Sequence, residues 1–263
     1  MDQAHLLEAA DRNVATVLRH FAVHADGAVL SESDAALLVA AAAPFPGAFH
    51  NAAIRLDPGS SADSVLEELR SFSVQHSRDI ILWAASHRDA DLAQAAAAAG
   101  LQFRSTARGM ATSTSPDEPI VSGGVELDRV TDAVGVAQFA AVHEQVFRDS
   151  GRPAEAVAHF ASPGALLAPT VEAFVARIGS RPVACAMAVV SGQEAGVYWV
   201  ATRPDARRRG FGELVTRAAV RAAFEHGIRV VVLQSTEHGE PLYRQLGFGP
   251  FTEYARYLRS HVD

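Results

Sequence analysis

A run of three arginines stands before a helix whose first residues include glycine. The segment 207–212 reads RRRGFG and joins a predicted strand over residues 196–202 to a predicted helix over 211–226. Glycines without a Cβ atom allow a ligand to approach the backbone N–H groups, which carry the positive end of the dipole at a helix N-terminus. Each glycine at an early helical position costs about 1 kcal/mol relative to alanine if nothing binds there. The segment therefore predicts a site for an anion such as a diphosphate, in preference to a solvated run of charge.

A second segment, residues 240–248, reads EPLYRQLGF and follows a predicted strand over 228–234. The motif R-x-x-G-x-G at the start of a helix, followed by a strand and then by P-L-Y-x-x-L-G-F, resembles the GCN5-related N-acetyltransferases (GNAT). The resemblance covers residues 125–258. It implies a mixed, mostly antiparallel central sheet flanked by helices, and a reaction in which a substrate amine attacks the thioester of acetyl-CoA directly.

The resemblance also implies which residues bind acetyl-CoA. The strand edge that holds the pantetheine arm and the thioester carbonyl corresponds to the backbone of Val200, Ala201 and Thr202. The loop that binds the pyrophosphate corresponds to the residues Arg207, Arg208, Arg209, Gly210, Phe211, Gly212 and Glu213.

Tyr243 corresponds to the tyrosine that protonates the departing thiolate. A phenol with a pKa near 10 is a suitable donor to a thiolate whose conjugate acid has a pKa near 8.5. The alternative role for Tyr243 is that of an aromatic residue of the core. Many relatives have Asn seven residues before this tyrosine, where this chain has Thr236, and threonine makes the same contact with a shorter reach.

The general base is not identified by the sequence. Candidates are His143 and Glu144 on a predicted helix, Glu194 before a strand, and His238 near the tyrosine. Each can equally be an ordinary surface or packing residue, because geometry decides before pKa does. Cys185 lies between alanines in a predicted strand and is expected to be a small core residue.

Composition excludes several classes of chemistry. The chain has 263 residues, of which 49% are apolar, and all of its 23 basic residues are arginine. Without lysine, a phosphate-loop lysine and a Schiff-base lysine are impossible. A single cysteine excludes an intramolecular disulfide and a cysteine-built zinc site, and the histidines show no close ligand spacing, so no metal is expected.

The acidic residues are distributed unevenly. Residues 1–118 contain 15 acidic residues and 8 arginines, whereas residues 119–263 contain 15 of each. This argues against a nucleic-acid partner and leaves arginines available for an anionic ligand in the second part. No apolar run reaches the roughly 18 residues of a membrane span, and no secretion signal is recognised, so we expect a cytoplasmic protein without a membrane partner.

Two units of one fold are predicted, in an α/β (α+β) class. The segment 111–124 is rich in Ser, Thr, Pro and Gly and separates a front unit, residues 1–115, from a back unit, residues 124–263. Hydrophobic periodicity and turn signals predict helices over 5–21, 61–76, 89–99, 132–147, 211–226 and 240–246. They predict strands over 35–43, 48–56, 80–85, 103–110, 125–130, 171–178, 182–190, 196–202, 228–234 and 251–258, with 150–169 irregular.

The front unit is expected to be a degenerate copy of the back unit. At the corresponding junction of strand and helix, residues 57–61 read DPGSS and lack the R-x-x-G-x-G motif, so this unit would have no pyrophosphate loop. The sequence thus favours an acetyl-CoA-dependent N-acyltransferase acting on a small-molecule or peptide amine. It leaves open a non-catalytic acyl-CoA-binding or regulatory module, an acyl donor other than acetyl-CoA, and the oligomeric state.

Overall fold

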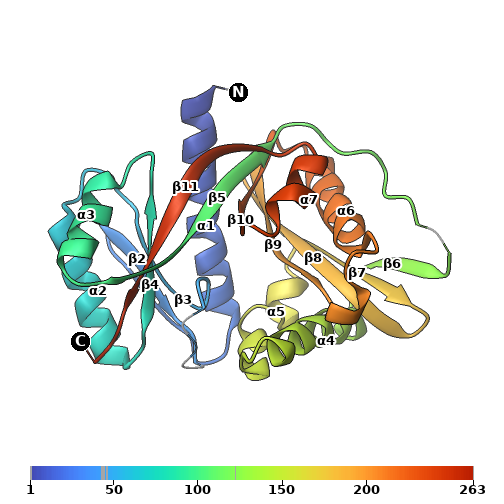
Figure 1. Ribbon diagram of the computed structural model, residues 1–263, viewed down its shortest axis with the longest axis horizontal. Coiled ribbons are helices and arrows are strands. Elements are labelled where there is room, and N and C mark those ends of the chain that lie inside the picture. Colours follow the sequence, from blue (N-terminus) through green and yellow to red (C-terminus); the bar gives the residue numbers. More distant parts are fainter. Residues whose placement is uncertain (1, 43–44, 46, 122, 263) are drawn as a thin grey trace.

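The computed structural model describes residues 2–42, 45, 47–121 and 123–262 (Figure 1). Ala43 at the end of a predicted strand, Ser122 in the predicted linker, and the end residues Met1 and Asp263 of the two predicted units lie outside the described residues.

Each predicted unit has a run of three consecutive strands, followed by strands that alternate with helices. The helical segments are α1 (Gln3–His24), α2 (Ala62–His76), α3 (Ala90–Ala98), α4 (Ala133–Asp149), η1 (Ala154–His159), α5 (Pro163–Leu166), η2 (Pro204–Ala206), α6 (Phe211–Glu225) and α7 (Glu240–Gln245). The strands are β1 (Val29–Glu32), β2 (Ala36–Ala40), β3 (Asn51–Arg55), β4 (Ile80–Ala85), β5 (Gln102–Thr112), β6 (Val125–Arg129), β7 (Val171–Ile178), β8 (Arg181–Ser191), β9 (Glu194–Thr202), β10 (Val230–Ser235) and β11 (Gly249–Arg259).

The described strands form one continuous sheet. Its order is β1-β2-β3-β4-β11-β5-β10-β9-β8-β7-β6, and its two parallel pairs are β3 with β4 and β9 with β10. The other neighbouring strands run antiparallel. The predicted class, a mixed and mostly antiparallel sheet flanked by helices, is confirmed.

The last strands of the two predicted units are exchanged. β5 ends the front unit but pairs with β10, and β11 ends the back unit but pairs with β4. β5 and β11 also pair with each other and cross the middle of the molecule side by side (Figure 1). The last strand of the chain therefore lies between two front-unit strands. The two segments 1–115 and 124–263 share one sheet, and their boundaries as separate units remain a prediction.

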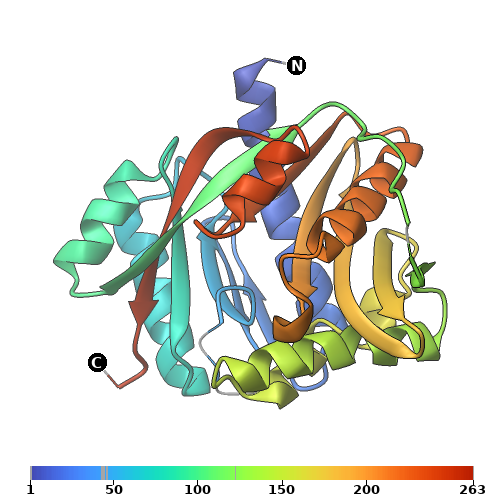
Figure 2. The same ribbon diagram turned by 45° about the vertical axis from the view of Figure 1, so that its right-hand side comes forward.

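One long helix supports the centre of this sheet. α1 packs on the same face as α4 and α5, while α2, α3, α6 and α7 cover the other face (Figures 1 and 2). Val17 and Phe21 of α1 pack with back-unit strands, whereas Val14 and Leu18 pack with β2, β3 and β4. Asn13 donates to the Val189 carbonyl at 3.2 Å, so α1 belongs to both units at once.

The structure contains a strand and helical segments that the sequence did not predict. β1 was not predicted because this edge strand is mostly exposed and has no apolar alternation. The prediction that residues 150–169 are irregular is wrong, because they contain η1 and α5. Ser162 begins α5 by accepting a hydrogen bond from the Ala165 N–H at 3.2 Å, and Pro163 occupies the first turn, where a missing N–H is tolerated.

Two further observations concern the core and the helices. Cys185 is fully buried, and burial raises the pKa of its thiol, which confirms the prediction of a core residue. None of the helices in the described residues is both long enough and apolar enough to cross a membrane.

Three buried histidines lie on the α1 face, and two of them, His50 and His159, join the units. His50 Nε2 lies 2.9 Å from the Ala156 carbonyl, and His159 Nε2 lies 3.2 Å from the Phe49 carbonyl, so each ring bonds to the other's segment. Their rings stack with centroids 5.0 Å apart. His143 Nε2 lies 2.9 Å from the Trp199 carbonyl. Because a carbonyl only accepts, each Nε2 carries the hydrogen.

We expect these histidines to make the fold sensitive to acid. Burial lowers the pKa of His50 to about 3 and those of His143 and His159 to about 4. The unfolded chain binds protons below a pH of about 6.5 that the folded rings do not bind, so the free energy of unfolding falls as the pH drops from there toward 4. Each ring contributes at most about 1.4 kcal/mol per pH unit to the slope of the free energy of unfolding against pH. Urea unfolding at a series of pH values measures this slope.

The matched variants separate these rings from other titrating groups. His159→Phe removes one buried imidazole and should make the dependence on pH shallower, whatever it does to the stability at neutral pH. His238→Gln changes an exposed ring and should leave the slope unchanged. An equal slope in wild type and His159→Phe would contradict the assignment.

Candidate functional site

β9 and β10 run together for a short distance and then separate. Their parallel register covers Val230 to Val232, and Val232 lies opposite Gly196. Three residues later β9 has a bulge, where two residues, Trp199 and Val200, face one residue of β8. Trp199 has a φ of +52°, in the left-handed region. A bulge bends its strand, so the remainder of β9 turns away from β10 and a gap opens between the two strands.

The three strand residues predicted to bind the acyl arm lie on this diverging segment. Val200 packs against the cluster beneath α6, and Ala201 is buried on the α4 face. The Thr202 carbonyl accepts a hydrogen bond from Arg207 Nε at 3.2 Å. The structure therefore places Val200, Ala201 and Thr202 at the edge of the gap and beside the arginine run.

The predicted anion loop is at the wide end of the gap. Gly210 precedes α6 with a φ of +81° and makes no side-chain cap. The first backbone bond of α6 runs from the Leu214 N–H to the Gly210 carbonyl, so the N–H groups of Phe211, Gly212 and Glu213 are left outside the helical hydrogen bonding. A Cβ atom on Gly212 would lie 3.3 Å from Thr202 Oγ1. The start of α6 therefore lies directly against the end of β9.

The arginine run adds positive charge at the same place. Arg207, Arg208 and Arg209 are exposed, and none of them forms an ion pair with a carboxylate in the described part of the chain. The Arg209 guanidinium lies 5.1 Å from the centroid of the Phe211 ring. The only carboxylate in the first turn, Glu213, pairs with Arg217 at 2.6 Å. The free N–H groups and three uncompensated cations together suit a diphosphate.

Tyr243 lies on α7, next to the end of β10. A Cβ atom on Gly239 would lie 3.1 Å from Cε2 of Tyr243, 3.3 Å from Ser235 Oγ and 3.4 Å from Thr236 Oγ1. The small residue thus allows the Tyr243 ring to approach the last residue of β10. Thr236 is exposed, and its Oγ1 accepts a hydrogen bond from the Gly239 N–H at 3.3 Å, which helps to form the turn before α7.

Burial raises the pKa of Tyr243 to about 12. The phenol therefore keeps its proton at neutral pH and is available as a donor. The ring packs edge-on against Phe248, with centroids 6.0 Å apart, and α7 lies beside α6 over the gap (Figure 2). The tyrosine and the anion loop are therefore brought to the same face of the sheet.

The four candidate bases are not brought together. Glu194 stands where β9 and β10 are still paired, and Arg12 neutralises it at 3.0 Å. Glu144 is partly exposed and pairs with Arg148 at 2.7 Å. His238 is exposed in the turn before α7. His143 is buried beneath the bulge and donates to it. Of the four, His143 is the one whose side chain bonds to the diverging part of β9, at the Trp199 carbonyl.

Sequence reasoning missed two features of this site. The bulge at Trp199 has no glycine to mark it, so no local signal indicates the left-handed backbone. Gly239 could have been noticed as a small residue at the start of the helix that carries Tyr243. The bulge depends on contacts between elements that are far apart in the sequence, whereas the contacts of Gly239 are with its near neighbours.

The corresponding gap of the front unit is filled. β3 and β4 are parallel up to Ile54 and Trp83, and beyond them Arg88 donates to the Arg55 carbonyl at 2.5 Å and to the Leu56 carbonyl at 3.3 Å. The buried Arg55 side chain pairs with Asp89 at 3.4 Å and with Asp91 at 2.9 Å.

The front-unit helix start is also occupied. Ser61 caps α2 by accepting a hydrogen bond from the Ser64 N–H at 3.1 Å. In this unit, side chains of the chain itself therefore hydrogen-bond to the backbone at the end of β3 and at the start of α2.

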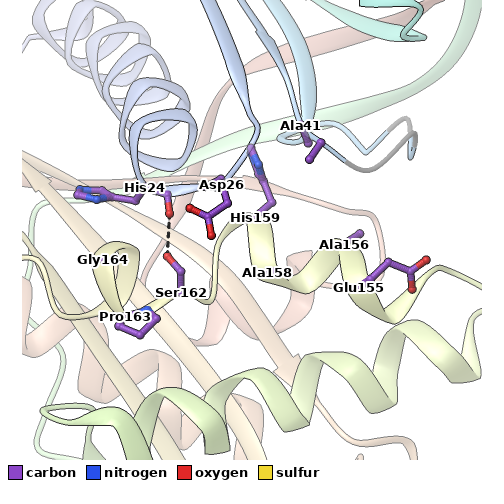
Figure 3. A pocket seen from close by; sticks show the side chains of 12 residues that line it. His24, Asp26, Ala41, Glu155, Ala156, Ala158, His159, Ser162, Pro163 and Gly164 are labelled. Atoms are coloured by element: carbon purple, nitrogen blue, oxygen red, sulfur yellow. Dashed lines mark hydrogen bonds between the residues drawn. The ribbon is translucent and has the colours of Figure 1, made fainter.

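A pocket of about 330 Å³ lies elsewhere, between the end of α1, the end of β2 and the segment 154–164 (Figure 3). Asp26, Glu155 and His159 contribute polar groups to its lining, and Ser162 Oγ donates to the His24 carbonyl at 2.9 Å. It shares no residue with the predicted acetyl-CoA site. In the described ranges, no group of three or more His, Cys, Asp or Glu side chains could hold a metal ion.

Residues 136–248, which include the gap, the anion loop and Tyr243, match the model of the Acetyltransferase (GNAT) family. This segment is a GNAT domain. No curated protein matches the chain in sequence.

Solved structures share the fold over nearly the whole chain. A GCN5-related N-acetyltransferase from Kribbella flavida is 19% identical with a TM-score of 0.72, and the match covers 95% of each chain. A tandem GNAT protein from the clavulanic acid biosynthesis pathway, without AcCoA, is 14% identical with a TM-score of 0.63, again over 95% of each chain. A GCN5-related N-acetyltransferase from Sphaerobacter thermophilus is 13% identical with a TM-score of 0.64, over 94% of this chain and 85% of that one.

We expect Gly210→Ala to destabilise the GNAT domain. The φ of +81° is in the left-handed region, where a residue with a Cβ atom costs about 1–2 kcal/mol. Urea unfolding measures the change. Gly249→Ala is the matched control, because its added Cβ would meet no atom within 4 Å and its backbone is not left-handed. If both variants are equally stable, the helix start does not need glycine at position 210.

Proposed function

We propose that this chain is an acetyl-CoA-dependent N-acyltransferase, in which a substrate amine attacks the thioester directly. The observation that carries the proposal is the gap between β9 and β10, which begins after Gly196 and Val232 and ends at the uncapped start of α6. Its donors fit a diphosphate at one end, and the strand edge at Val200 to Thr202 fits an extended arm. The acceptor is a small-molecule or peptide amine.

Each part of the site has one task in this reaction. Arg207, Arg208 and Arg209 neutralise the pyrophosphate beside the N–H groups of α6. The backbone of Val200, Ala201 and Thr202 holds the pantetheine arm and polarises the thioester carbonyl, where negative charge develops as the amine adds. Tyr243 donates its phenolic proton to sulfur as the C–S bond breaks. The burial that raises the pKa of Tyr243 also favours the neutral form of the thiol beside it.

The front unit is proposed to bind no acetyl-CoA. Arg88 uses the carbonyl groups at the edge of β3, and the ion pairs of Arg55 fill the space between the strands. Opening this gap would leave several buried charges without partners, at a cost of about 3–5 kcal/mol for each broken pair. The proposal is therefore one acetyl-CoA site in each chain.

Tyr243→Phe tests the proton donor. We expect a fall in kcat of about 10²-fold or more, with little change in the affinity for acetyl-CoA, because only the transfer of the proton is lost. Release of free thiol is measured with acetyl-CoA and a panel of amines. Tyr257→Phe is the control, since this tyrosine packs against Phe103, away from the gap.

The outcomes of that assay separate the alternatives. Unchanged turnover in Tyr243→Phe would remove Tyr243 from the mechanism. If the wild type binds CoA in calorimetry but turns over no amine in the panel, the chain is a non-catalytic acyl-CoA-binding module.

Calorimetric titration with CoA tests the anion loop and the number of sites. Replacing Arg207, Arg208 and Arg209 together by glutamine removes three charges, and we expect the affinity to fall by about 10²-fold with a weaker dependence on salt. Wild type should bind one CoA per chain. Arg221→Gln, on the exposed side of the same helix, should bind as wild type does. Equal affinities in the triple variant and the wild type would place the pyrophosphate elsewhere.

A further inference from the structure

The bulge in β9 is held by side chains from outside its own strand. Trp199 adopts a φ of +52°, which costs about 1–2 kcal/mol for a residue other than glycine. Such a conformation persists only where its surroundings impose it. The contacts of Trp199 therefore decide where the last residues of β9 lie.

Two kinds of contact fix this residue. Its indole ring is stacked on the ring of Phe160, with centroids 3.5 Å apart and planes 3° apart. Its carbonyl cannot take part in the regular β8–β9 pairing, because the bulge puts two residues opposite one. His143 Nε2 supplies the missing donor at 2.9 Å. A buried carbonyl left without a donor would cost about 1–3 kcal/mol.

His143 is itself held in one orientation. It lies on α4 and is 3% exposed, with the rings of Phe139, Phe147 and Phe160 around it at centroid distances of 5.3, 6.4 and 4.9 Å. Its burial keeps it uncharged, so the bond to the bulge does not change across the neutral pH range.

We propose that His143 is a positioning residue that fixes the bulge at Trp199, and through it the amide groups of Val200 to Thr202 that receive the acyl carbonyl. This inference rests on the proposed function, because it assigns those amides to the thioester. His143 acts through the backbone of β9 and takes no proton from the amine.

The test compares two substitutions. His143→Leu keeps an apolar side chain beneath the bulge but has no donor. His143→Gln retains a donor, since the glutamine amide nitrogen reaches about as far as Nε2 of histidine. Calorimetry gives the dissociation constants of acetyl-CoA and CoA for each protein. Val134→Ala, at an exposed position of the same helix, is the matched control and should bind both ligands as wild type does.

We expect His143→Leu to weaken the binding of acetyl-CoA by about tenfold, the value of one hydrogen bond, while the binding of CoA changes much less. CoA is affected less because it ends in a thiol and has no acyl carbonyl to bind these amides. His143→Gln should restore most of the affinity for acetyl-CoA. If both ligands weaken equally, or if neither changes, His143 does not position the acyl group and the proposal is overturned.

Amide spectra of the free protein separate this inference from the proposed function. Loss of the donor should shift the ¹H–¹⁵N resonances of residues 199–202 in His143→Leu but not in His143→Gln. If those shifts appear while the wild type binds neither ligand, His143 holds the bulge but the acetyl-CoA function is wrong. If the resonances do not move, His143 does not hold the bulge, whatever the protein binds.

Discussion

The pairing of β5 with β10 is the interaction on which the rest of the structure depends. β10 has β9 on one side only as far as Val232, and beyond that residue it is supported by β5 alone. A strand that loses its neighbour on one side needs the other neighbour to stay in place. β5 thus allows β9 and β10 to separate without disturbing the sheet. The gap exists because β5, a front-unit strand, holds β10 in place on the side away from β9.

α1 joins the two units by side-chain packing, as β5 joins them by backbone hydrogen bonds. The helix packs under strands of both units, and its Asn13 accepts a hydrogen bond from the buried Tyr198 hydroxyl at 2.7 Å. A Cβ atom on Gly196 would lie 1.9 Å from Asn13 Oδ1, so the helix and β9 could not approach as they do with any other residue there. The residue opposite Val232, where the strands part, is therefore also a point of close packing between α1 and β9.

The parts of the site that local chemistry determines could be predicted from the sequence. Hydrophobic periodicity predicted a helix over 211–226, and α6 begins at Phe211. The predicted helix over 240–246 matches α7 to within one residue. The predicted strand over 48–56 begins later, at Asn51, because the His50 and Asn51 N–H groups bond to the Gly47 carbonyl in a turn.

Neither the strand exchange nor the bulge could be predicted in this way. An alternating strand such as β11 has the same pattern whether its neighbour is β4 or β10, and Trp199 takes a positive φ because His143 and Phe160 are placed beside it.

The exchanged strands have a consequence for how the two units can differ. Two separate and identical chains could form the same kind of sheet across a two-fold axis by trading their last strands. In such a pair every substitution occurs in both chains. An arginine that fills the gap between the parallel strands of one chain would therefore fill the same gap in the other. A single chain does not have that symmetry, so Arg88 can fill the front-unit opening whatever residues stand in the back unit. One opening is filled by the ion pairs of Arg55 with Asp89 and Asp91, while the other lies beside the exposed arginines 207–209 and is the proposed acetyl-CoA site.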